Sequence, residues 1–373
     1  MKFSTRCVQL GRGDDAHGAI VPPIYQTATF EQPMATEFGE FDYTRSGNPT
    51  RALLEAQLAD LEGATHASTF ASGMAALTAL TRIVKAGEAI IAGDDLYGGT
   101  VRLLDHLSSQ QNISMRYVNT TNVDELKQTL TSRTRLILIE TPSNPLFRIS
   151  DIPALAAIAK DSGVYLAVDN SMLSPVFQQP LSLGADVVVH SATKFLCGHS
   201  DVTAGALITN DLALHQQFAW QQNAEGAGLS PFESWLLLRG LKTLALRVER
   251  QNDSAAKLVR FLQTRSEVTR VLYPGLGAVI SFTTGDEKLS AAIVDTTRLF
   301  KVAVSFGSVG STISLPCRMS HASIPAALKD RLSPPTDLVR LSVGIEDADD
   351  LILDLERAFT ANSREEQLEE AVQ

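Results

Sequence analysis

Short apolar runs alternate with helix-like segments between residues 88 and 209, and this alternation constrains the fold more than any other feature of the chain. The apolar runs have the length of strands and cover 88–93, 114–118, 136–140, 164–169, 185–190 and 204–209. Helix-like segments lie between them, near 100–110, 122–130 and 152–162. Apolar strands that alternate with helices indicate a largely parallel sheet covered on both faces. The sequence therefore predicts an α/β fold.

The regions on either side of this pattern differ from it. Residues 1–50 have little periodicity and carry breakers such as Pro22-Pro23 and Asn48-Pro49, so we expect an arm that either only packs or contributes to a neighbouring subunit. Beyond residue 245, a helical segment precedes short apolar runs at 268–273, 277–282 and 338–343. The sequence predicts an N-terminal arm over 1–50, a large domain over 51–245 and a smaller α+β domain over 246–373.

Composition excludes several classes of partner. The chain of 373 residues has a net charge of -10, so it offers no broad basic surface to nucleic acid or anionic lipid. Cys7, Cys197 and Cys317 are too few and too scattered for a disulfide framework or a Cys-based metal site. No apolar run reaches the length of a membrane span. We expect a cytoplasmic protein with no nucleic-acid partner, no membrane partner and no metal.

Polar residues end three of the predicted strands. Glu140, Asp169 and His190 each close an apolar run, and ligands of open α/β sheets bind beyond such strand ends. Lys194 follows in the run Ser191-Ala192-Thr193-Lys194. A desolvated lysine at this rim can lose its proton and attack carbonyls, although an isolated lysine after a strand is more often an ordinary surface residue.

Two further segments are candidates for ligand contacts. Ser72-Gly73-Met74 opens a predicted helix, where backbone N–H groups and the helix dipole favour an anion, although such openings often only cap a helix. Tyr97 lies just past the strand at 88–93 and could stack on a flat heterocycle or pack in the core. Each segment alone is a weak signal.

Together these residues meet the needs of a pyridine-type cofactor that serves as an electron sink. Such a cofactor requires a lysine for its Schiff base, a carboxylate that keeps the ring nitrogen protonated, and a phosphate anchor. Lys194 and Asp169 supply the first two. The opening at Ser72-Gly73-Met74, with the hydroxyl groups of Ser191 and Thr193, supplies the third. Their joint occurrence at strand ends favours a cofactor site.

Five motifs, taken in order, resemble the Cys/Met metabolism family of pyridoxal-phosphate enzymes. They are Tyr43-Thr44-Arg45-Ser46-Gly47-Asn48-Pro49-Thr50, Ser72-Gly73-Met74-Ala75-Ala76, Val168-Asp169-Asn170-Ser171, Ser191-Ala192-Thr193-Lys194 and Leu338-Val339-Arg340-Leu341-Ser342-Val343-Gly344-Ile345-Glu346. The resemblance extends from about residue 4 to 361 and implies the aspartate-aminotransferase-like fold type I, a mostly parallel sheet in the large domain, pyridoxal 5'-phosphate as cofactor and a homotetramer built as a dimer of dimers. One departure is that Leu276 and Gly277 abut where the family usually has a longer loop.

The resemblance also implies roles for single residues. Lys194 is the implied Schiff-base lysine and catalytic base, Asp169 the pyridinium partner, and Tyr97 the ring that stacks on the cofactor and could protonate the leaving group. The implied phosphate contacts are Gly73, Met74, Ser191 and Thr193, with Tyr43 and Arg45 from the neighbouring subunit. The implied substrate and ring-oxygen contacts are Arg340 on the α-carboxylate, Ser305 and Tyr43 in the substrate pocket, and Asn144 at the cofactor's phenolic oxygen.

The implied activity is that of a carbon–sulfur lyase of methionine biosynthesis acting on an amino-acid thioether. β-Elimination of L-cystathionine would release homocysteine, pyruvate and ammonia. Many family members that act at Cγ resemble a Gly-Gly-x-Glu-Ser pattern where this chain has Ser308-Val309-Gly310-Ser311, and the missing acidic residue at Gly310 favours β-elimination. A γ-lyase or γ-synthase remains an alternative. A non-catalytic binding protein is the other alternative, and the presence of Lys194 argues against it.

Overall fold

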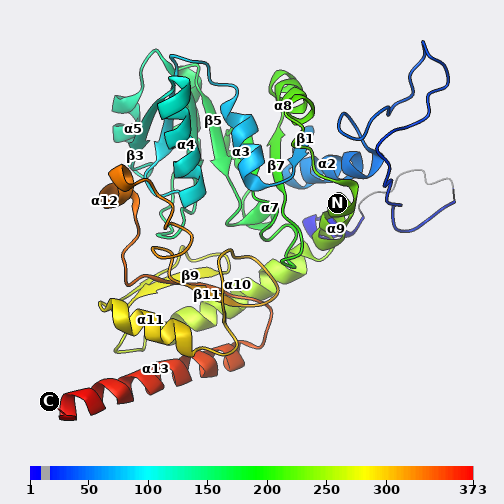
Figure 1. The fold of residues 1–373 in the computed structure, drawn as a ribbon. Coiled ribbons are helices and arrows are strands. Elements are labelled where there is room, and N and C mark those ends of the chain that lie inside the picture. The colour runs from blue at the N-terminus through cyan, green and yellow to red at the C-terminus, as the bar shows by residue number, and fades with distance from the viewer. Residues whose placement is uncertain (10–16, 373) are drawn as a thin grey trace. The chain divides into compact units, whose positions relative to one another are not determined.

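The computed structural model describes residues 1–9 and 17–372, and it separates the chain into two compact units (Figure 1). The first unit comprises residues 1–93, 107–139 and 150–245. The second unit comprises residues 94–106, 140–149 and 246–373. Within the described residues, no helix is both long and apolar enough to cross a membrane.

A seven-stranded sheet forms the centre of the first unit, with the strand order β1-β7-β6-β5-β4-β2-β3. Its strands are β1 (His66–Phe70), β2 (Ala89–Gly93), β3 (Ser114–Val118), β4 (Thr134–Glu140), β5 (Tyr165–Asp169), β6 (Val187–His190) and β7 (Gly205–Thr209). The pairs β2–β3, β2–β4 and β5–β6 are parallel, whereas β7 is antiparallel to both β6 and β1. The prediction of an α/β fold with a largely parallel sheet is therefore confirmed.

The antiparallel edge strand β1 was not predicted, because its sequence His66-Ala67-Ser68-Thr69-Phe70 is too polar for a buried strand. Ser68 and Thr69 are nevertheless buried. The backbone N–H of Thr69 and its hydroxyl donate to Glu55 Oε1 at 2.8 and 3.0 Å. Hydrogen bonds from outside the strand thus satisfy polar groups that the hydrophobic pattern cannot explain.

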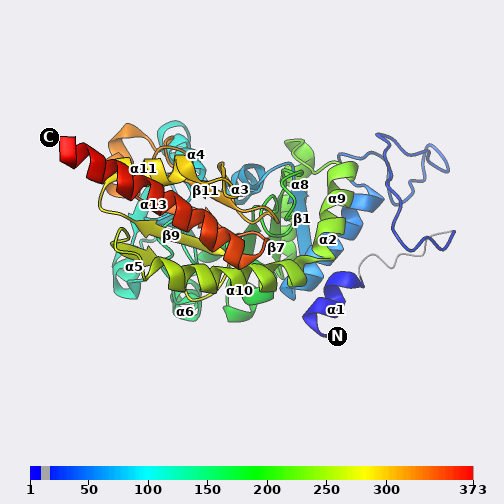
Figure 2. The same ribbon diagram turned by 90° about the horizontal axis from the view of Figure 1, so that it is seen from below.

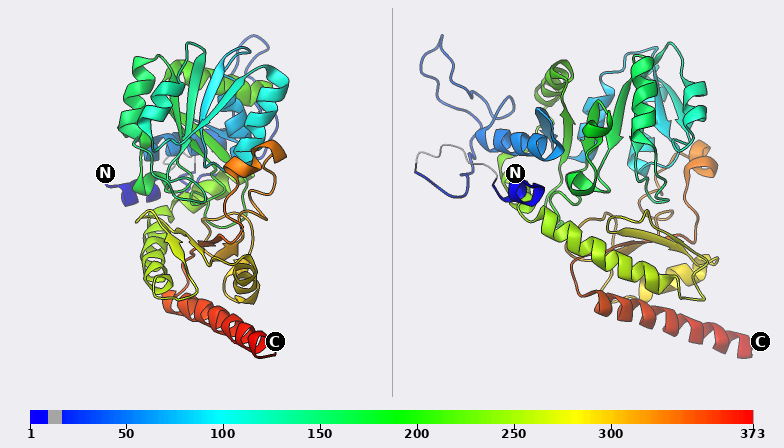
Figure 3. Two further views of the ribbon diagram at one scale, coloured as in Figure 1. Left: turned by 90° about the vertical axis from the view of Figure 1, so that its left-hand side faces the viewer. Right: turned by 180° about the vertical axis from the view of Figure 1, so that it is seen from behind.

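Helices cover both faces of this sheet, as Figure 3 shows. They are α2 (Pro49–Glu62), α3 (Gly73–Thr81), α5 (Val123–Thr129), α6 (Ile152–Asp161) and α8 (Leu212–Ala224), and shorter or peripheral helices are α1 (Phe3–Val8), α7 (Ser174–Phe177), η1 (Pro180–Leu183) and α9 (Pro231–Leu241). A further helix, α4 (Gly98–Gln111), contains residues of both units. One cluster of buried side chains joins α5 and α6 to the sheet, including Leu126, Leu155, Ile137 and Leu166. Burial of such aliphatic side chains, worth roughly 1.5–3 kcal/mol each, holds the strands in place.

A five-stranded sheet with the order β10-β11-β12-β9-β8 organises the second unit. Its strands are β8 (Arg270–Leu272), β9 (Val279–Thr283), β10 (Lys301–Val302), β11 (Thr312–Ser314) and β12 (Val339–Ser342), and its helices are α10 (Leu244–Leu262), α11 (Glu287–Thr296), η2 (Ala326–Leu328), α12 (Lys329–Leu332) and α13 (Ala348–Val372). All strand pairs except β10–β11 are antiparallel. Figure 2 shows α13 between α11 and α10.

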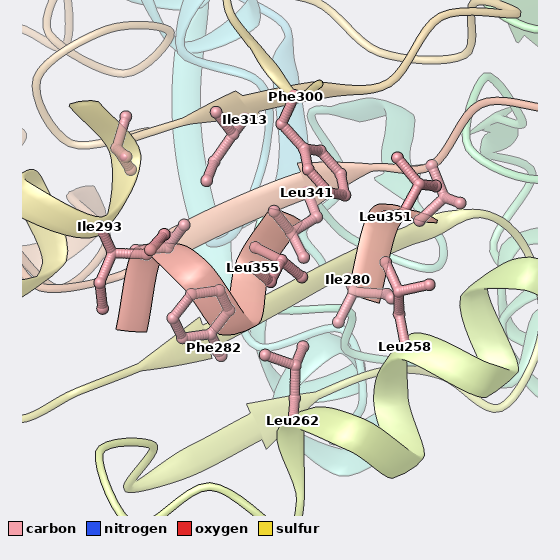
Figure 4. Packing of buried hydrophobic residues seen from close by; sticks show 14 of the residues in the cluster. Leu258, Leu262, Ile280, Phe282, Ile293, Phe300, Ile313, Leu341, Leu351 and Leu355 are labelled. Atoms are coloured by element: carbon pink, nitrogen blue, oxygen red, sulfur yellow. The ribbon is translucent and has the colours of Figure 1, made fainter. Parts of the chain in front are cut away.

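The core of the second unit lies between this sheet and its helices (Figure 4). Leu258 and Leu262 of α10, Phe282 of β9 and Leu355 of α13 belong to one fully buried cluster. This packing fixes β12, the strand that carries Arg340. The short connection at Leu276 and Gly277 is a turn in which the Tyr273 hydroxyl donates to the Gly277 carbonyl oxygen at 3.0 Å.

Candidate active site

The segment after β6 is a tight turn that fixes the position of Lys194. The Lys194 N–H donates to the Ser191 carbonyl oxygen at 3.1 Å, and the Lys194 carbonyl oxygen accepts from the Gly198 N–H at 2.8 Å. The Thr193 hydroxyl bonds the backbone of Ala204 through both its N–H, at 2.9 Å, and its carbonyl oxygen, at 3.2 Å. The turn is therefore anchored beside the start of β7, and Lys194 is half-buried.

Asp169 ends β5, next to β6, and is linked to this turn by Ser171. The Ser171 N–H donates to Asp169 Oδ1 at 2.9 Å, and the Ser171 hydroxyl oxygen accepts from the Ser191 N–H at 2.6 Å. Burial raises the pKa of Asp169, while hydrogen bonds from Ser171 and the nearby charges of His190 and Lys194 act in the opposite direction. A carboxylate in this environment is stabilised by a cationic partner.

The opening of α3 lies against the same turn. Ser72 caps the helix, and its hydroxyl oxygen accepts from the Ala75 N–H at 3.0 Å. A Cβ atom at Gly73 would stand 2.9 Å from Ser191 Cβ, so only glycine permits this close approach. A Cβ at Gly205 would collide with the Ser72 carbonyl oxygen. The first turn of α3, including Met74, is thus brought beside Ser191, where backbone N–H groups can face an anion.

In the second unit, Arg340 lies at the centre of a buried polar group. Its Nη1 donates to Asn144 Oδ1 at 2.7 Å, its Nη2 donates to the Ser305 carbonyl oxygen at 3.2 Å, and its guanidinium stands 5.5 Å from the centre of the Phe306 ring. Arg340 is 2% exposed. Burial lowers its pKa to about 10, against the opposite effects of Glu140 and Tyr97. A desolvated guanidinium favours an anionic ligand.

His321 completes this group. Its Nε2 lies 3.2 Å from the Asn144 carbonyl oxygen and its Nδ1 lies 3.0 Å from the Ser320 hydroxyl, which assigns the ring proton to Nε2. Burial, followed by the charge of Arg340, lowers the pKa of His321 to about 4. The imidazole is therefore neutral at pH 7 and adds no second positive charge beside Arg340.

Tyr97 and Ser305 are held by backbone contacts within the second unit. The Tyr97 N–H donates to Glu140 Oε2 at 3.1 Å, and its side chain is 40% exposed. Ser305 has a φ of 84°, an uncommon conformation for a residue with a side chain. The next residues are fixed as well, because the Gly307 N–H donates to the Ser342 hydroxyl oxygen at 2.9 Å.

Tyr43 and Arg45 belong to the N-terminal segment of the first unit. The Arg45 guanidinium stands 5.1 Å from the centre of the Tyr43 ring, and Arg45 Nε donates to Asn223 Oδ1 at 3.1 Å. Buried Arg51 holds their backbone by donating to the carbonyl oxygens of Thr44 and Arg45 at 2.8 and 3.1 Å. Both predicted ligands keep exposed side chains.

These contacts provide a fit for pyridoxal phosphate on the first unit's own residues. Asp169 offers a half-buried carboxylate with a raised pKa, which a protonated ring nitrogen would neutralise. Gly73 offers a cradle that a Cβ atom would fill, next to the hydroxyl of Ser191. Lys194 supplies the amine on the same turn.

Comparison with known proteins agrees with this geometry. The family described as Cys/Met metabolism PLP-dependent enzyme matches residues 4–360. The chain belongs to this family. Its members depend on pyridoxal phosphate, and the fold is the fold type I of these enzymes, with a mostly parallel sheet in one part and a smaller α+β part.

Individual relatives cover nearly the whole chain. The chain is 49% identical over 372 residues to a chloroplastic cystathionine beta-lyase of Arabidopsis thaliana, covering 95% of this chain and 80% of the relative. It is 42% identical to a cystathionine gamma-lyase of Bacillus subtilis, covering 96% and 99%. The solved structure of metB from Corynebacterium glutamicum has a TM-score of 0.94 and 40% identity, covering 97% and 98%.

Sequence reasoning found most polar residues of these two groups but missed several of their partners. Ser171 stood inside a quoted motif without an assigned task, and no task was assigned to His321. Glu62 was not considered, although its Oε1 lies 2.6 Å from Nε2 of His190 and both side chains are buried. Its partner lies 128 positions away, so no local pattern could reveal the pair. Cys197 and His199 make local polar contacts. The Cys197 thiol donates to Asp201 Oδ1 at 3.2 Å, and His199 Nδ1 lies 2.8 Å from the Cys197 carbonyl oxygen.

Proposed function

We propose that this family member is a cystathionine β-lyase, which cleaves L-cystathionine to homocysteine, pyruvate and ammonia in methionine biosynthesis. The observation that carries the proposal is the 49% identity to a curated cystathionine beta-lyase over 95% of the chain. The absence of an acidic side chain at Gly310 supports it, since many family members that act at Cγ resemble a pattern with a glutamate there. A Cβ at Gly310 would meet no atom within 4 Å, so lack of space does not explain the glycine.

Two residues divide the chemistry at the cofactor. When bound, pyridoxal phosphate supplies the electron sink that stabilises negative charge at the substrate Cα. In our proposal Lys194 binds the cofactor and, as a free amine, removes the Cα proton as general base. Asp169 would keep the proton on the ring nitrogen, because partial desolvation makes its carboxylate favour a cationic partner.

The turn after β6 and the first residues of α3 would bind the phosphate group of the cofactor. The N–H groups of Gly73 and Met74 would donate to the phosphate oxygens, together with the hydroxyl groups of Ser191 and Thr193. Tyr97 would stack on the cofactor ring. Tyr43 and Arg45 would reach the phosphate of a neighbouring subunit, and their exposed side chains support this role.

The buried polar residues around Arg340 would bind the substrate. Arg340 would bind the substrate α-carboxylate through its planar guanidinium, and Ser305 and Tyr43 would line the same pocket. Asn144 would face the cofactor's phenolic oxygen, and its bond to Arg340 ties these two tasks together. Release of the thiolate at Cβ then requires a proton donor, for which Lys194 and Tyr97 are the candidates. Water hydrolyses the remaining three-carbon imine to pyruvate and ammonia.

We propose a homotetramer of two close dimers, located in the cytoplasm. Large apolar side chains of the N-terminal segment support an assembly, because Ile20 is 95% exposed and Phe38 is 71% exposed. The three free cysteines fit a reducing compartment. Light scattering coupled to size exclusion tests the tetramer, and a monomeric mass would contradict it.

A γ-lyase is the second candidate, favoured by the 42% identity to the Bacillus subtilis enzyme. The two activities differ in the keto acid they release. Incubation of the holoenzyme with L-cystathionine should give mainly pyruvate, whereas 2-oxobutyrate as the main product would replace the β-lyase proposal by the γ-lyase. Lys194→Ala is the control for background reaction with free cofactor.

A further inference from the structure

A buried acid–base pair lies directly behind the proposed cofactor site and has no task in the mechanism above. Glu62 is the last residue of α2, and its Oε1 lies 2.6 Å from Nε2 of His190, the last residue of β6. Each side chain is 1% exposed. Full burial of two ionisable groups costs free energy unless they compensate each other, so the pair needs an explanation.

Glu62 Oε1 joins two residues, because it lies 2.6 Å from His190 Nε2 and accepts a hydrogen bond from Asn170 Nδ2 at 3.1 Å. Glu62 Oε2 is buried and has no hydrogen-bond partner among the residues that the structure describes. Glu62 also lies at the C-terminus of α2, where the helix dipole repels negative charge. His190 and Asn170 are the two side chains that compensate this buried carboxyl group.

His190 contacts Glu62 through only one of its two ring nitrogens. His190 Nδ1 is buried and has no hydrogen-bond partner among the residues that the structure describes. Asp169 lies one position along the neighbouring strand, because Asp169 pairs with Val189 in the parallel β5–β6 ladder. Side chains alternate along a strand, so the side chains of Asp169 and His190 leave opposite faces of the sheet on neighbouring strands about 4.8 Å apart. The charge of His190 opposes the rise in the pKa of Asp169 that burial causes.

Asn170 connects the pair to Asp169 mechanically as well. It is fully buried, donates to Glu62 and to the Gln178 carbonyl oxygen at 2.7 Å, and accepts from Gln178 Nε2 at 3.0 Å. Asn170 stands between Asp169 and Ser171, and Ser171 in turn bonds both Asp169 and the Ser191 N–H. The cluster Glu62, His190 and Asn170 thus fixes the backbone on both strands of the site.

We infer that His190, held by Glu62 and Asn170, is a positioning residue that keeps Asp169 ionised and oriented toward the ring nitrogen of the cofactor. The inference rests on the proposed role of Asp169 and extends it to a cluster on the opposite side of the strand ends. No bond is made or broken, and the effect is electrostatic and steric.

A double-mutant cycle tests this inference on the affinity for pyridoxal phosphate and on the visible absorption of the bound cofactor. His190→Gln should weaken cofactor binding about tenfold, within the range found for coupled neighbours, and should shift the absorption of the bound form. Asp169→Asn should weaken it further. In the Asp169→Asn background, adding His190→Gln should change the affinity by less than about twofold, because its target is gone.

A purely structural His190 would give the opposite result. His190→Gln would then weaken binding equally with Asp169 or Asn at position 169, and the inference would be overturned. Glu62→Gln, which keeps the shape of the side chain, should reproduce the coupled behaviour and serves as the second arm if His190→Gln folds poorly. Asp354→Asn, a buried carboxylate in the second unit, is the matched control and should leave both readouts unchanged.

The same cycle separates this inference from the proposed function. If Asp169→Asn alone leaves cofactor affinity and absorption as they are, the proposed role of Asp169 is wrong and the inference falls with it. If Asp169→Asn has its effect while His190→Gln has none, only the inference is overturned. Both readouts are measured without substrate, so the identity of the thioether does not affect them.

Discussion

Two clusters of polar side chains, one around Asp169 in the first unit and one around Arg340 in the second, have central residues of opposite charge. In the first unit a carboxylate, Asp169, is desolvated, and its pKa is raised. In the second unit a guanidinium, Arg340, is desolvated, and its pKa is lowered to about 10. Each group is therefore incomplete alone and is stabilised by a ligand of the opposite sign, a cation for Asp169 and an anion for Arg340.

The difference between the groups lies in their neighbours. Asp169 has positive groups nearby, His190 and Lys194, which preserve its charge before any ligand arrives. Arg340 has instead His321, whose pKa of about 4 keeps it neutral at pH 7. In our proposal the first group holds the cofactor, and the second binds the carboxylate of the substrate. The following predictions test this contrast, beginning with the largest expected effect.

Lys194→Ala should reduce lyase activity by at least about 10³-fold, since it removes both the cofactor amine and the proposed base. It should also abolish the visible absorption that the bound cofactor has in the wild type. The measurement combines steady-state kinetics with an absorption spectrum, and a melting curve confirms that the variant is folded. Retention of a tenth of the activity would exclude Lys194 as the base.

Arg340→Lys should lower kcat/KM by about 10²- to 10³-fold, because a lysine cannot form the planar double contact with a carboxylate and leaves Asn144 with a changed partner. The loss should be mainly in KM, and cofactor absorption should remain. Arg318→Lys, at an exposed ion pair with Glu287, is the control and should behave as the wild type. A loss of cofactor in Arg340→Lys would contradict the proposal that Arg340 binds the substrate whereas the residues of the first unit bind the cofactor.

Acid should destabilise the protein through His321. The unfolded chain binds this proton near pH 6.5 and the folded protein only near pH 4, so the contribution is complete above pH 6.5 and is lost as the pH falls from 6.5 toward 4. The total is about 3 kcal/mol in the free energy of unfolding. Denaturant unfolding across this range measures it.

The matched comparison for this acid effect uses two histidine variants. His321→Gln should flatten the pH dependence between 6.5 and 4, whereas His199→Gln, at an exposed position, should leave it as in the wild type. An unchanged slope in His321→Gln would show that other groups cause the acid loss.

The smallest effect is expected at a buried carboxylate outside both groups. Asp354 accepts from the N–H groups of Arg298, Leu299 and Phe300, at 2.8 to 3.3 Å. Asp354→Asn should lower the free energy of unfolding by about 1–3 kcal/mol without altering cofactor absorption. Asp60→Asn, at an exposed ion pair with Arg6, should change stability by less than about 1 kcal/mol. A change of cofactor absorption in Asp354→Asn would contradict the expectation that this carboxylate affects stability alone.

Sequence reasoning reached the parallel strands, the cap at Ser72 and the motif residues because each has a local signal. Apolar runs predict strands, and helix openings have a preferred residue, as Ser72 shows at α3. The polar strand β1 was missed because its hydrogen-bond partner, Glu55, lies on another element. The Glu62–His190 pair was missed for the same reason. Local patterns identify elements and motif residues, whereas buried polar partners depend on tertiary contacts.

The central claim is that this chain catalyses β-elimination with proton removal at Cα alone. The most direct measurement is the reaction of L-cystathionine in D₂O, with both the thiol and the keto acid identified by mass spectrometry at early times. β-Elimination predicts equal amounts of homocysteine and pyruvate, with one solvent deuterium in the methyl group of the pyruvate. Cysteine together with 2-oxobutyrate that carries deuterium at C3 would contradict it, because that product requires proton removal at Cβ as well.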